Sequence, residues 1–330
     1  MSVSESTGAQ LPAQRTMHAL RLHERGGAEQ IVYETAPVPP IGFGDALVRV
    51  HAASITPTEL QWPSTWEDRA GRDRRPVIPA HELAGTVAAL GDGTSGLPIG
   101  AAVYGLADWY RDGAAADYIA VEVRNLAPMP ASLSFVEAAA VPLAGLTAWQ
   151  ALFDHGGLAA GMTVLIHGAG GGVGTFAVQL AHAAGARVVA TGREWARSLV
   201  TELGADEFID MERQRFEDVV GAVDLVVDLV GGDVLQRSWA VVKPGGMLVS
   251  AVQDPATIST ATTAMPRKAR SVYFVVAPDR AELVELAHRI DAGALRPIIG
   301  SVIPLADGRI AFQTKHTGEV PGKVVLAVTN

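Results

Sequence analysis

The stretch from Met162 to Arg193 constrains the fold of this chain most. Five glycines fall within the seven residues Gly168 to Gly174, directly after an apolar, β-branched run at Thr163 to His167 that predicts a buried parallel strand. The apolar spacing that follows predicts a helix ending at Gly185, and Arg187 to Thr191 predicts a second buried strand. Strand, glycine turn, helix and strand within about thirty residues are typical of a dinucleotide-binding unit.

Each glycine has its own physical role in such a turn. Gly168 and Gly171 let the backbone turn tightly and approach a pyrophosphate, and Gly174 lets the helix pack closely on the sheet. Gly172 and Val173 begin the helix, where free N–H groups and the helix dipole favour an anion. The spacing is GxxGxxG, and the alternative is a glycine loop of an α/β core that binds nothing.

Length and composition exclude several classes of function. A chain of 330 residues is long enough for about two domains. The net charge of −9 argues against nucleic acid as a partner, and no stretch approaches the roughly 20 apolar residues of a membrane helix. Cysteine is absent, which excludes disulfides, thiolate nucleophiles and zinc sites that use sulfur. Residues 1–16 are expected to be a disordered tail, not a signal peptide, so we expect a cytoplasmic protein.

Glycines and prolines separate short strands in the first part of the chain, a pattern that predicts a small β-barrel-like domain. The expected strands are Met17 to Leu22, Ala46 to Ala52, Gly85 to Ala89, Ala102 to Tyr104 and Tyr118 to Val121. The charged run Thr65 to Arg75 is either a solvated loop or a mobile rim of the active site. Ser134 and Glu137 form a capping box, and Leu143 to Phe153 is expected to be helical.

Helices and strands alternate after Arg193, as in a doubly wound sheet of about six strands. The expected helices are Ala196 to Leu203, Phe216 to Val220, Val234 to Val242 and Asp279 to Asp291, and the expected strands are Glu207 to Ile209, Leu225 to Asp228, Met247 to Val252 and Val272 to Val276. Lys323 to Val328 is again strand-like and would return to the first domain.

Eight motifs together resemble one family. They are SITPTE at Ser54 to Glu59, PAHELAGTV at Pro79 to Val87, DGAAADY at Asp112 to Tyr118, AAAVPLAGLTAWQAL at Ala138 to Leu152, the glycine turn, LGAD at Leu203 to Asp206, KPGG at Lys243 to Gly246 and PGKVVL at Pro321 to Leu326. From Met17 to Asn330 the chain resembles a medium-chain dehydrogenase/reductase of the zinc-independent quinone oxidoreductase branch, which includes zeta-crystallin. The resemblance implies an α/β protein: a GroES-like β-barrel catalytic domain at 17–143, completed by 294–330, and a doubly wound Rossmann NADP-binding domain at 144–293.

Zinc-containing relatives hold a catalytic zinc with two cysteines and one histidine, at positions that match Thr56, His81 and Leu143 here. Threonine and leucine do not replace thiolates as zinc ligands, so the resemblance implies a site without metal. His81 and Glu82 are then either hydrogen-bonded structural residues or a catalytic remnant.

The end of the second buried strand bears on the choice of cofactor. NAD-binding relatives place an acid there to bind the ribose, whereas this chain has Gly192 and Arg193, with Arg197 one turn later. Two guanidinium groups suit the 2′-phosphate of NADPH. Glu194 either repels that phosphate or pairs with Arg197, and the alternative is that the arginines are a solvated surface pair.

The resemblance also implies where the nicotinamide lies. It would be lined by Thr147, Val230, Ala251, Phe274 and Val276, with Thr56 close to its ring or ribose. Hydride transfer without a metal suits a quinone or an α,β-unsaturated carbonyl, because conjugation takes up the electron density.

The residue that supplies the proton is open, between Tyr110 and water. Trp62, Trp66 and Trp109 either stack on a flat substrate or close the interdomain core. The function expected is therefore an NADPH-dependent quinone or enone reductase, with a nucleotide-binding sensor or structural protein as the alternative. Relatives pair the edge strand Val272 to Val276 across a two-fold axis, so we expect a homodimer.

Overall fold

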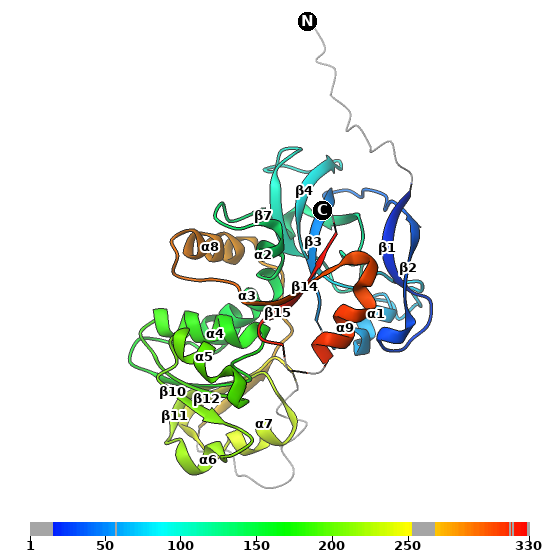
Figure 1. The fold of residues 1–330 in the computed structure, drawn as a ribbon. Coiled ribbons are helices and arrows are strands. Elements are labelled where there is room, and N and C mark those ends of the chain that lie inside the picture. The colour runs from blue at the N-terminus through cyan, green and yellow to red at the C-terminus, as the bar shows by residue number, and fades with distance from the viewer. Residues whose placement is uncertain (1–15, 57, 253–267, 317, 319, 329–330) are drawn as a thin grey trace, which may run out of the picture.

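The computed structural model describes residues 16–56, 58–252, 268–316, 318 and 320–328, which form a mainly antiparallel barrel-like sheet and a parallel sheet (Figure 1). The α/β fold expected from the sequence, a GroES-like domain with a Rossmann-type domain, is confirmed. Of the expected tail, residues 1–15 lie outside the described residues, and Thr16 already belongs to the first strand.

The first sheet has seven strands in the order β14-β15-β3-β4-β5-β7, with β6 paired to β3. Its strands are β3 (Asp45–Ser54), β4 (Glu82–Leu90), β5 (Ala102–Leu106), β6 (Tyr118–Glu122), β7 (Leu126–Pro128), β14 (Ile299–Pro304) and β15 (Lys323–Ala327). β1 (Thr16–Leu22) and β2 (Ile31–Pro37) form a separate antiparallel pair. Two ends of the chain thus build one sheet, because β15 pairs with β3 across the whole intervening sequence.

The second sheet is parallel and has the order β10-β9-β8-β11-β12-β13, which is the doubly wound order with its switch point between β8 and β11. Its strands are β8 (Thr163–His167), β9 (Arg187–Gly192), β10 (Glu207–Asp210), β11 (Val223–Asp228), β12 (Val242–Ser250) and β13 (Arg270–Tyr273). The helices that connect them are α4 (Gly172–Ala183), α5 (Arg197–Glu202), α6 (Phe216–Val219) and α7 (Gly232–Ser238).

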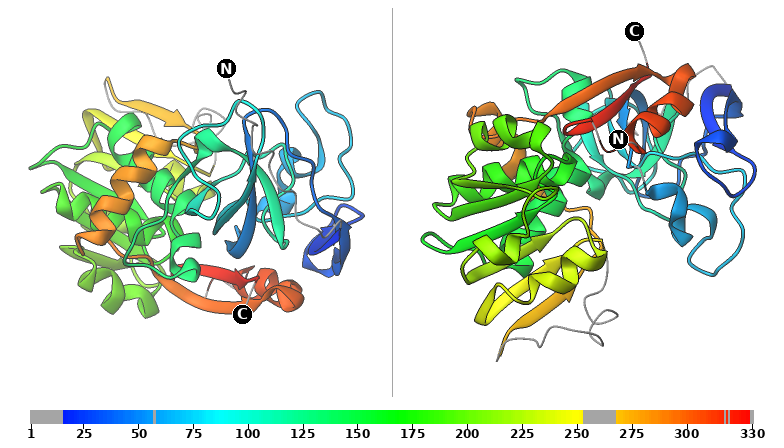
Figure 2. Two further views of the ribbon diagram at one scale, coloured as in Figure 1. Left: turned by 90° about the horizontal axis from the view of Figure 1, so that it is seen from above. Right: turned by 60° about the horizontal axis from the view of Figure 1, so that its bottom comes forward.

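The remaining helices link the two sheets or cover them (Figure 2). They are α1 (Pro63–Trp66), α2 (Phe135–Ala139), α3 (Pro142–Trp149), a π-helical segment at Gln150–His155, α8 (Arg280–Asp291) and α9 (Gly308–His316). Short 3-10 turns lie at Ala28–Gln30, Glu59–Gln61, Val123–Asn125, Glu194–Ala196 and Leu305–Asp307. The capping box of Ser134 and Glu137 is confirmed, and Asp279 caps α8 by accepting from the Glu282 N–H.

Most expected elements differ from the structure by a few residues at their ends, and three of these differences lie in the last two strands of the parallel sheet and the helix before them. The helix expected at Val234 to Val242 ends at Ser238, and Val242 already pairs with Val223 in β12. β12 itself ends at Ser250 and not at Val252. β13 ends at Tyr273, so most of the strand expected at Val272 to Val276 lies beyond the sheet. Phe274 and Val276 are buried there, while Val275 is 60% exposed.

Candidate active site

The glycine turn has the geometry of a close backbone approach. Gly168 has a φ of +72°, the left-handed region that favours glycine, and Gly171 is the N-cap of the twelve-residue helix α4. A Cβ on Gly174 would fall against Gly168 O and 2.6 Å from Ala169 Cα. The first turn of α4 therefore packs on the backbone that follows β8, and its N–H groups lie at the carboxyl edge of the parallel sheet.

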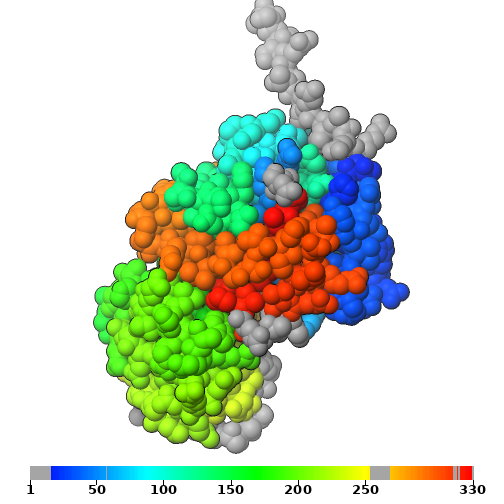
Figure 3. All heavy atoms as spheres, in the orientation of Figure 1, coloured from blue at the N-terminus to red at the C-terminus, as the bar shows by residue number. Residues whose placement is uncertain are grey.

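The C-terminal segment of the barrel lies directly on this turn. Gly322 N donates to Gly170 O at 3.0 Å, and Gly171 and Gly322 form an isolated parallel bridge. A Cβ on Gly172 would meet Lys323 Cδ at 2.6 Å. In the space-filling view the red and orange C-terminal atoms run between the green domain and the blue N-terminal strands (Figure 3). The two domains are thus joined at the start of α4.

Lys323 also reaches into the barrel. Its Nζ donates to the Glu82 carboxylate and to Ile55 O at 3.2 Å, and Leu143 N donates to Glu82 Oε2 at 3.0 Å. Both side chains are buried, and burial raises the pKa of the Glu82 carboxyl against the opposing effect of Lys323. Glu82 is therefore tied to the domain junction, because removing either partner would leave a charge buried without compensation.

The corner after β9 places Arg197 beside Glu194, as one of the two sequence interpretations of Glu194 expected. Arg197 Nε and Nη2 donate to the Glu194 carboxylate at 2.8 and 2.9 Å, and this hydrogen bonding raises the pKa of Arg197. Its Nη1 donates to Phe208 O at 3.1 Å, and its guanidinium lies 4.8 Å from the centre of the Phe208 ring. The donors of Arg197 are thus largely occupied.

Arg193 is the more open of the two arginines. Its side chain is exposed, its Nε lies 3.4 Å from Glu212 Oε1, and its Nη1 donates to Gly318 O at 3.5 Å. Gly192, just before it, is buried against Phe208 at the end of β9. The edge of the sheet therefore presents an exposed guanidinium, loosely paired with Glu212, beside a glycine, where an acidic residue would select NAD.

Asp228 is a buried residue of the candidate site that the sequence interpretation missed. It is fully buried at the end of β11, and its carboxylate accepts from Val230 N at 3.2 Å, Gly231 N at 3.0 Å and Ser250 Oγ at 2.9 Å. Ala251 N donates to the Asp228 main-chain oxygen at 3.2 Å. Asp228 thus fixes the loops that carry Val230 and Ala251. The sequence contained a signal for this role, because a carboxylate at the end of an apolar strand is buried and needs hydrogen-bond donors around it.

The remaining residues expected beside the nicotinamide lie on α3 and on the segment after β13. Thr147 is buried, and its hydroxyl donates to Leu143 O at 2.6 Å. Phe274 lies with its ring centre 4.6 Å from that of His155, and Trp109 Nε1 donates to Val276 O at 3.3 Å. This last bond joins a barrel loop to the inserted domain.

Gln150 holds the same segment from the other side. Its Nε2 donates to Ala277 O at 2.9 Å and its Oε1 accepts from Ala277 N at 3.1 Å. The Nε2 also contacts Glu282, and burial, with hydrogen bonding and repulsion from Asp154, raises the pKa of Glu282 to about 7. The segment that carries Phe274 and Val276 is therefore fixed by side chains of both domains.

The tryptophans separate into two groups. Trp66 is 4% exposed and its Nε1 donates to Leu60 O at 2.9 Å, so it belongs to the barrel core. Trp62 and Trp109 are half-buried and meet edge to face, with ring centres 5.2 Å apart. The His81 ring lies 5.1 Å from that of Trp109. Trp62 and Trp109 thus form an aromatic pair beside the buried polar network of His81.

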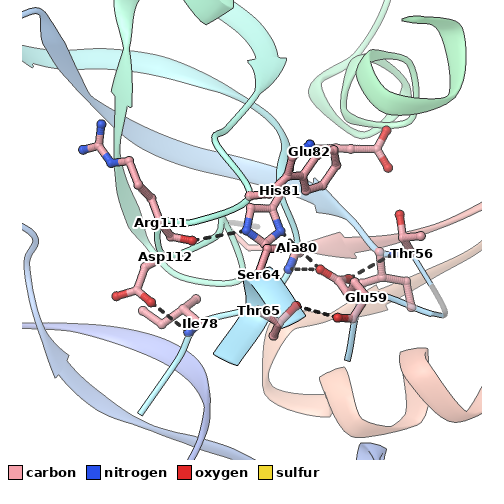
Figure 4. A network of polar contacts seen from close by, with 12 residues as sticks. Thr56, Glu59, Ser64, Thr65, Ile78, Ala80, His81, Glu82, Arg111 and Asp112 are labelled. Carbon is pink, nitrogen blue, oxygen red and sulfur yellow. Dashed lines mark hydrogen bonds and ion pairs between the residues drawn. The ribbon is translucent and has the colours of Figure 1, made fainter. Parts of the chain in front are cut away.

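Figure 4 shows this network around Glu59. Glu59 Oε1 accepts from Thr56 N at 3.1 Å, and its Oε2 accepts from Ala80 N at 2.9 Å and lies 3.4 Å from His81 Nδ1. His81 Nε2 lies 3.2 Å from Arg111 O. Glu59 and His81 are both almost fully buried, so they are isolated from solvent.

The local backbone explains why these groups converge. Ala80 has a φ of +67°, a strained conformation for a residue with a Cβ, and its O accepts from Ala114 N. Arg111 is held by a bidentate pair with Asp45, at 2.9 and 2.7 Å. Two loops that are distant in sequence are thereby fixed against β3.

Tyr110 and the charged run lie on the outer side of these loops. Tyr110 is 37% exposed, and the Arg69 guanidinium lies 4.6 Å from its ring centre. In the run Thr65 to Arg75, Thr65 is buried and donates to Glu59 O at 2.5 Å, whereas Arg72 is exposed. The expected solvated loop thus describes only the middle of the run.

Two family models match the chain. One, described as "Zinc-binding dehydrogenase", matches residues 203–326, and the other, described as "Alcohol dehydrogenase GroES-like domain", matches residues 42–131. The described part of the chain holds no group of three or more His, Cys, Asp or Glu side chains able to bind a metal. Leu143, at a position where zinc-containing relatives have a cysteine, has no side-chain atom that could bind one. Nor is any helix among the described residues long and apolar enough to cross a membrane.

Proteins of known activity are similar over nearly the whole chain. The chain is 32% identical to "2-methylene-furan-3-one reductase" of Solanum lycopersicum, covering 97% of this chain and 81% of the relative. It is 30% identical to "NADPH-dependent alkenal/one oxidoreductase, chloroplastic" of Arabidopsis thaliana, covering 98% and 82%. The solved quinone oxidoreductase from Coxiella burnetii superposes with a TM-score of 0.88 at 28% identity, covering 95% and 100%. With its two domains, glycine turn and sheet order, the chain belongs to the medium-chain dehydrogenase/reductase superfamily.

Proposed function

We propose that this protein is an NADPH-dependent, zinc-independent reductase that transfers hydride to a quinone or an α,β-unsaturated carbonyl compound. The observation that carries the proposal is the corner after β9, where Gly192 and Arg193 stand in place of an acid beside the glycine turn. The relatives are named as reductases or oxidoreductases of quinones, alkenals and a furanone, and these names agree with this substrate class.

The residues present fit a nicotinamide nucleotide. The glycine turn leaves no room for a Cβ at Gly174, and the N-terminus of α4 would hold the pyrophosphate. Arg193 would bind the 2′-phosphate, and Arg197 would join it where the phosphate displaces Glu194 from its guanidinium. The nicotinamide end would lie against Thr147, Val230, Ala251, Phe274 and Val276. When bound, the cofactor supplies the hydride.

The remaining chemistry falls to the chain's own groups. Glu59 fixes the backbone of Thr56, whose side chain would lie close to the nicotinamide ring or ribose. The Trp109–Val276 and Gln150–Ala277 hydrogen bonds hold the segment after β13, which would lie beside the nicotinamide. The proton that follows the hydride comes from Tyr110 or from water. Tyr110→Phe separates these sources, because a Tyr110 donor predicts a large loss of kcat and water predicts none.

Turnover under two cofactors tests the proposal. Absorbance at 340 nm would follow oxidation of NADPH and of NADH with a panel of ortho-quinones, alkenals and furanones, and with simple ketones as the control. We expect turnover of conjugated substrates with NADPH, much less with NADH, and no effect of added zinc or a chelator. Tight NADPH binding without oxidation by any acceptor would favour the alternative, a nucleotide-binding sensor or structural protein.

The proposal includes a cytoplasmic homodimer. β13 is an edge strand of the parallel sheet, and Tyr273 and Val275 beside it are 42% and 60% exposed. An unpaired edge with exposed apolar side chains favours pairing with a second copy. Light scattering on wild type and on Val275→Lys tests it, and a wild-type monomer would contradict it.

A further inference from the structure

His167 is a buried titratable residue that the proposed hydride transfer does not use. It ends β8, directly before the glycine turn, and is fully buried. Its Nδ1 lies 2.9 Å from Thr191 Oγ1 on β9, and its Nε2 lies 3.0 Å from Ser238 Oγ on α7. The Phe216 ring packs against it edge to face at 4.6 Å. One imidazole thus joins β8, β9 and α7, and both strands end at the carboxyl edge of the sheet, where the cofactor would bind.

The hydrogen bonds fix the state of this ring. Ser238 Oγ has one proton, which it donates to Val234 O at 2.7 Å. It must therefore accept from His167, which places the ring proton on Nε2. Nδ1 is then an acceptor, and the Thr191 hydroxyl donates to it. Burial lowers the pKa of His167 to about 3, which agrees with a neutral ring.

Thr191 connects this ring to both halves of the cofactor edge. Its main-chain oxygen accepts from Ala169 N, inside the glycine turn, at 3.0 Å. The next residue along the chain is Gly192, whose oxygen accepts from Met211 N at 2.9 Å, and Arg193 follows. The hydroxyl of Thr191 is thus bonded to the residue before the glycine turn, and its carbonyl is bonded to the turn itself.

We propose that His167 is a positioning residue that sets the spacing between the glycine turn and the corner at Gly192 and Arg193. The turn and the corner would bind two groups of one ligand, the pyrophosphate and the 2′-phosphate, which a short covalent link holds near each other, so a fixed spacing aligns Arg193 with the phosphate. The inference rests on the proposed function, because it concerns the same nucleotide. It assigns to a neutral histidine part of the selectivity for NADPH.

Thr191→Val tests the spacing without touching His167 itself, since it keeps the shape and removes the donated hydroxyl. Calorimetry would give the dissociation constants of NADP⁺ and NAD⁺ for wild type, Thr191→Val and Thr191→Ser. We expect Thr191→Val to reduce the preference for NADP⁺ by about threefold to tenfold, the range of one hydrogen bond, with NAD⁺ binding nearly unchanged. Thr191→Ser should restore the preference, and the same change at the exposed Thr201, Thr201→Val, should have no effect.

The outcomes separate the two proposals. Equal weakening of both nucleotides would indicate a merely structural role and overturn the inference, as would a preference unchanged in Thr191→Val. A wild-type chain that binds neither nucleotide would overturn the proposed function itself. A second readout is independent of binding: ¹⁵N spectra of His167 at neutral pH should show a neutral ring protonated on Nε2. An imidazolium or the opposite tautomer would overturn the inference.

Discussion

His81 and His167 are both buried and both have a partner at each ring nitrogen, yet their partners differ in kind. His167 lies between two hydroxyl groups, one of which donates to it while the other accepts. His81 lies between the Glu59 carboxylate and the Arg111 carbonyl, which are both acceptors. The first environment suits a neutral ring. The second offers the ring no donor.

The difference shows how the partners of a buried histidine differ in what they can adapt to. Hydroxyl groups adapt, because each one donates or accepts as its other partner requires. A carboxylate and a carbonyl only accept, so they do not adapt in this way. His81 therefore joins two barrel loops through two acceptors, whereas His167 joins β8, β9 and α7 through two hydroxyl groups.

Removal of the Glu59 carboxylate should have the largest effect. Glu59→Ala leaves the N–H groups of Thr56 and Ala80 and the His81 ring without their acceptor in a buried site. We expect a loss of about 3–5 kcal/mol in the free energy of unfolding, measured by urea denaturation. Glu67→Ala, which removes an exposed partner of Arg25, is the matched control and should cost less than about 1 kcal/mol. Equal losses in the two variants would contradict the burial argument.

The second largest effect is expected in the pH dependence of stability, to which His167 should contribute. Its pKa is lowered by burial from 6.5 to about 3, so between these values the unfolded chain binds more protons than the folded one. The contribution of His167 is therefore fully present above about pH 6.5 and is lost as the pH falls toward 3. Between pH 7 and pH 4, the free energy of unfolding of His167→Gln should fall by about 3 kcal/mol less than that of wild type, as measured by urea denaturation at each pH. Parallel pH profiles of the two proteins would show that the ring does not stay neutral.

A milder change at Glu59 keeps the side chain but removes one of its two acceptor oxygens. In Glu59→Gln the amide oxygen still accepts from one of the two backbone N–H groups, of Thr56 and Ala80, while the other loses its acceptor. We expect a loss of about 1–2 kcal/mol in the free energy of unfolding, measured by urea denaturation. A loss as large as that of Glu59→Ala would show that the remaining oxygen contributes nothing.

The smallest effect is expected at an exposed histidine. His23 Nε2 lies 2.8 Å from Glu34 Oε1, but the His23 side chain is 51% exposed. His23→Ala should change the free energy of unfolding by less than about 1 kcal/mol, because solvent screens the pair. A loss comparable to that of Glu59→Ala would mean that contact distance, and not burial, governs these histidine–carboxylate pairs.

The residues around His167 were largely predictable from the sequence. Strand, glycine turn and helix are consecutive in the chain, so local spacing identifies Gly168, Gly171 and Gly174 together with the corner at Gly192 and Arg193. The role of Thr191 was not predictable, because a buried hydroxyl at the end of an apolar strand resembles any other core threonine. Only the pairing of β8 with β9 brings it to His167.

The residues around His81 were much less predictable. The motif that contains Thr56 and Glu59 and the motif that contains His81 were recognised, but their contact with Arg111 uses a main-chain oxygen, which no residue type indicates. The strained backbone of Ala80 was equally hidden. The limits of β13 were wrong for a similar reason, because Trp109 and Gln150 draw Val276 and Ala277 away from the sheet.

The pairing of β15 with β3 also bears on how the protein is made. β15 follows every strand of the parallel sheet along the chain, whereas its partner β3 begins at Asp45, so the ribosome completes the parallel sheet before the barrel sheet has all its strands. During synthesis one edge of β3 stays unpaired until β15 has been translated. Such long-range pairing is slow and leaves the nascent chain exposed to aggregation. The nucleotide-binding half is therefore expected to be the first part of the newborn chain to resist proteolysis.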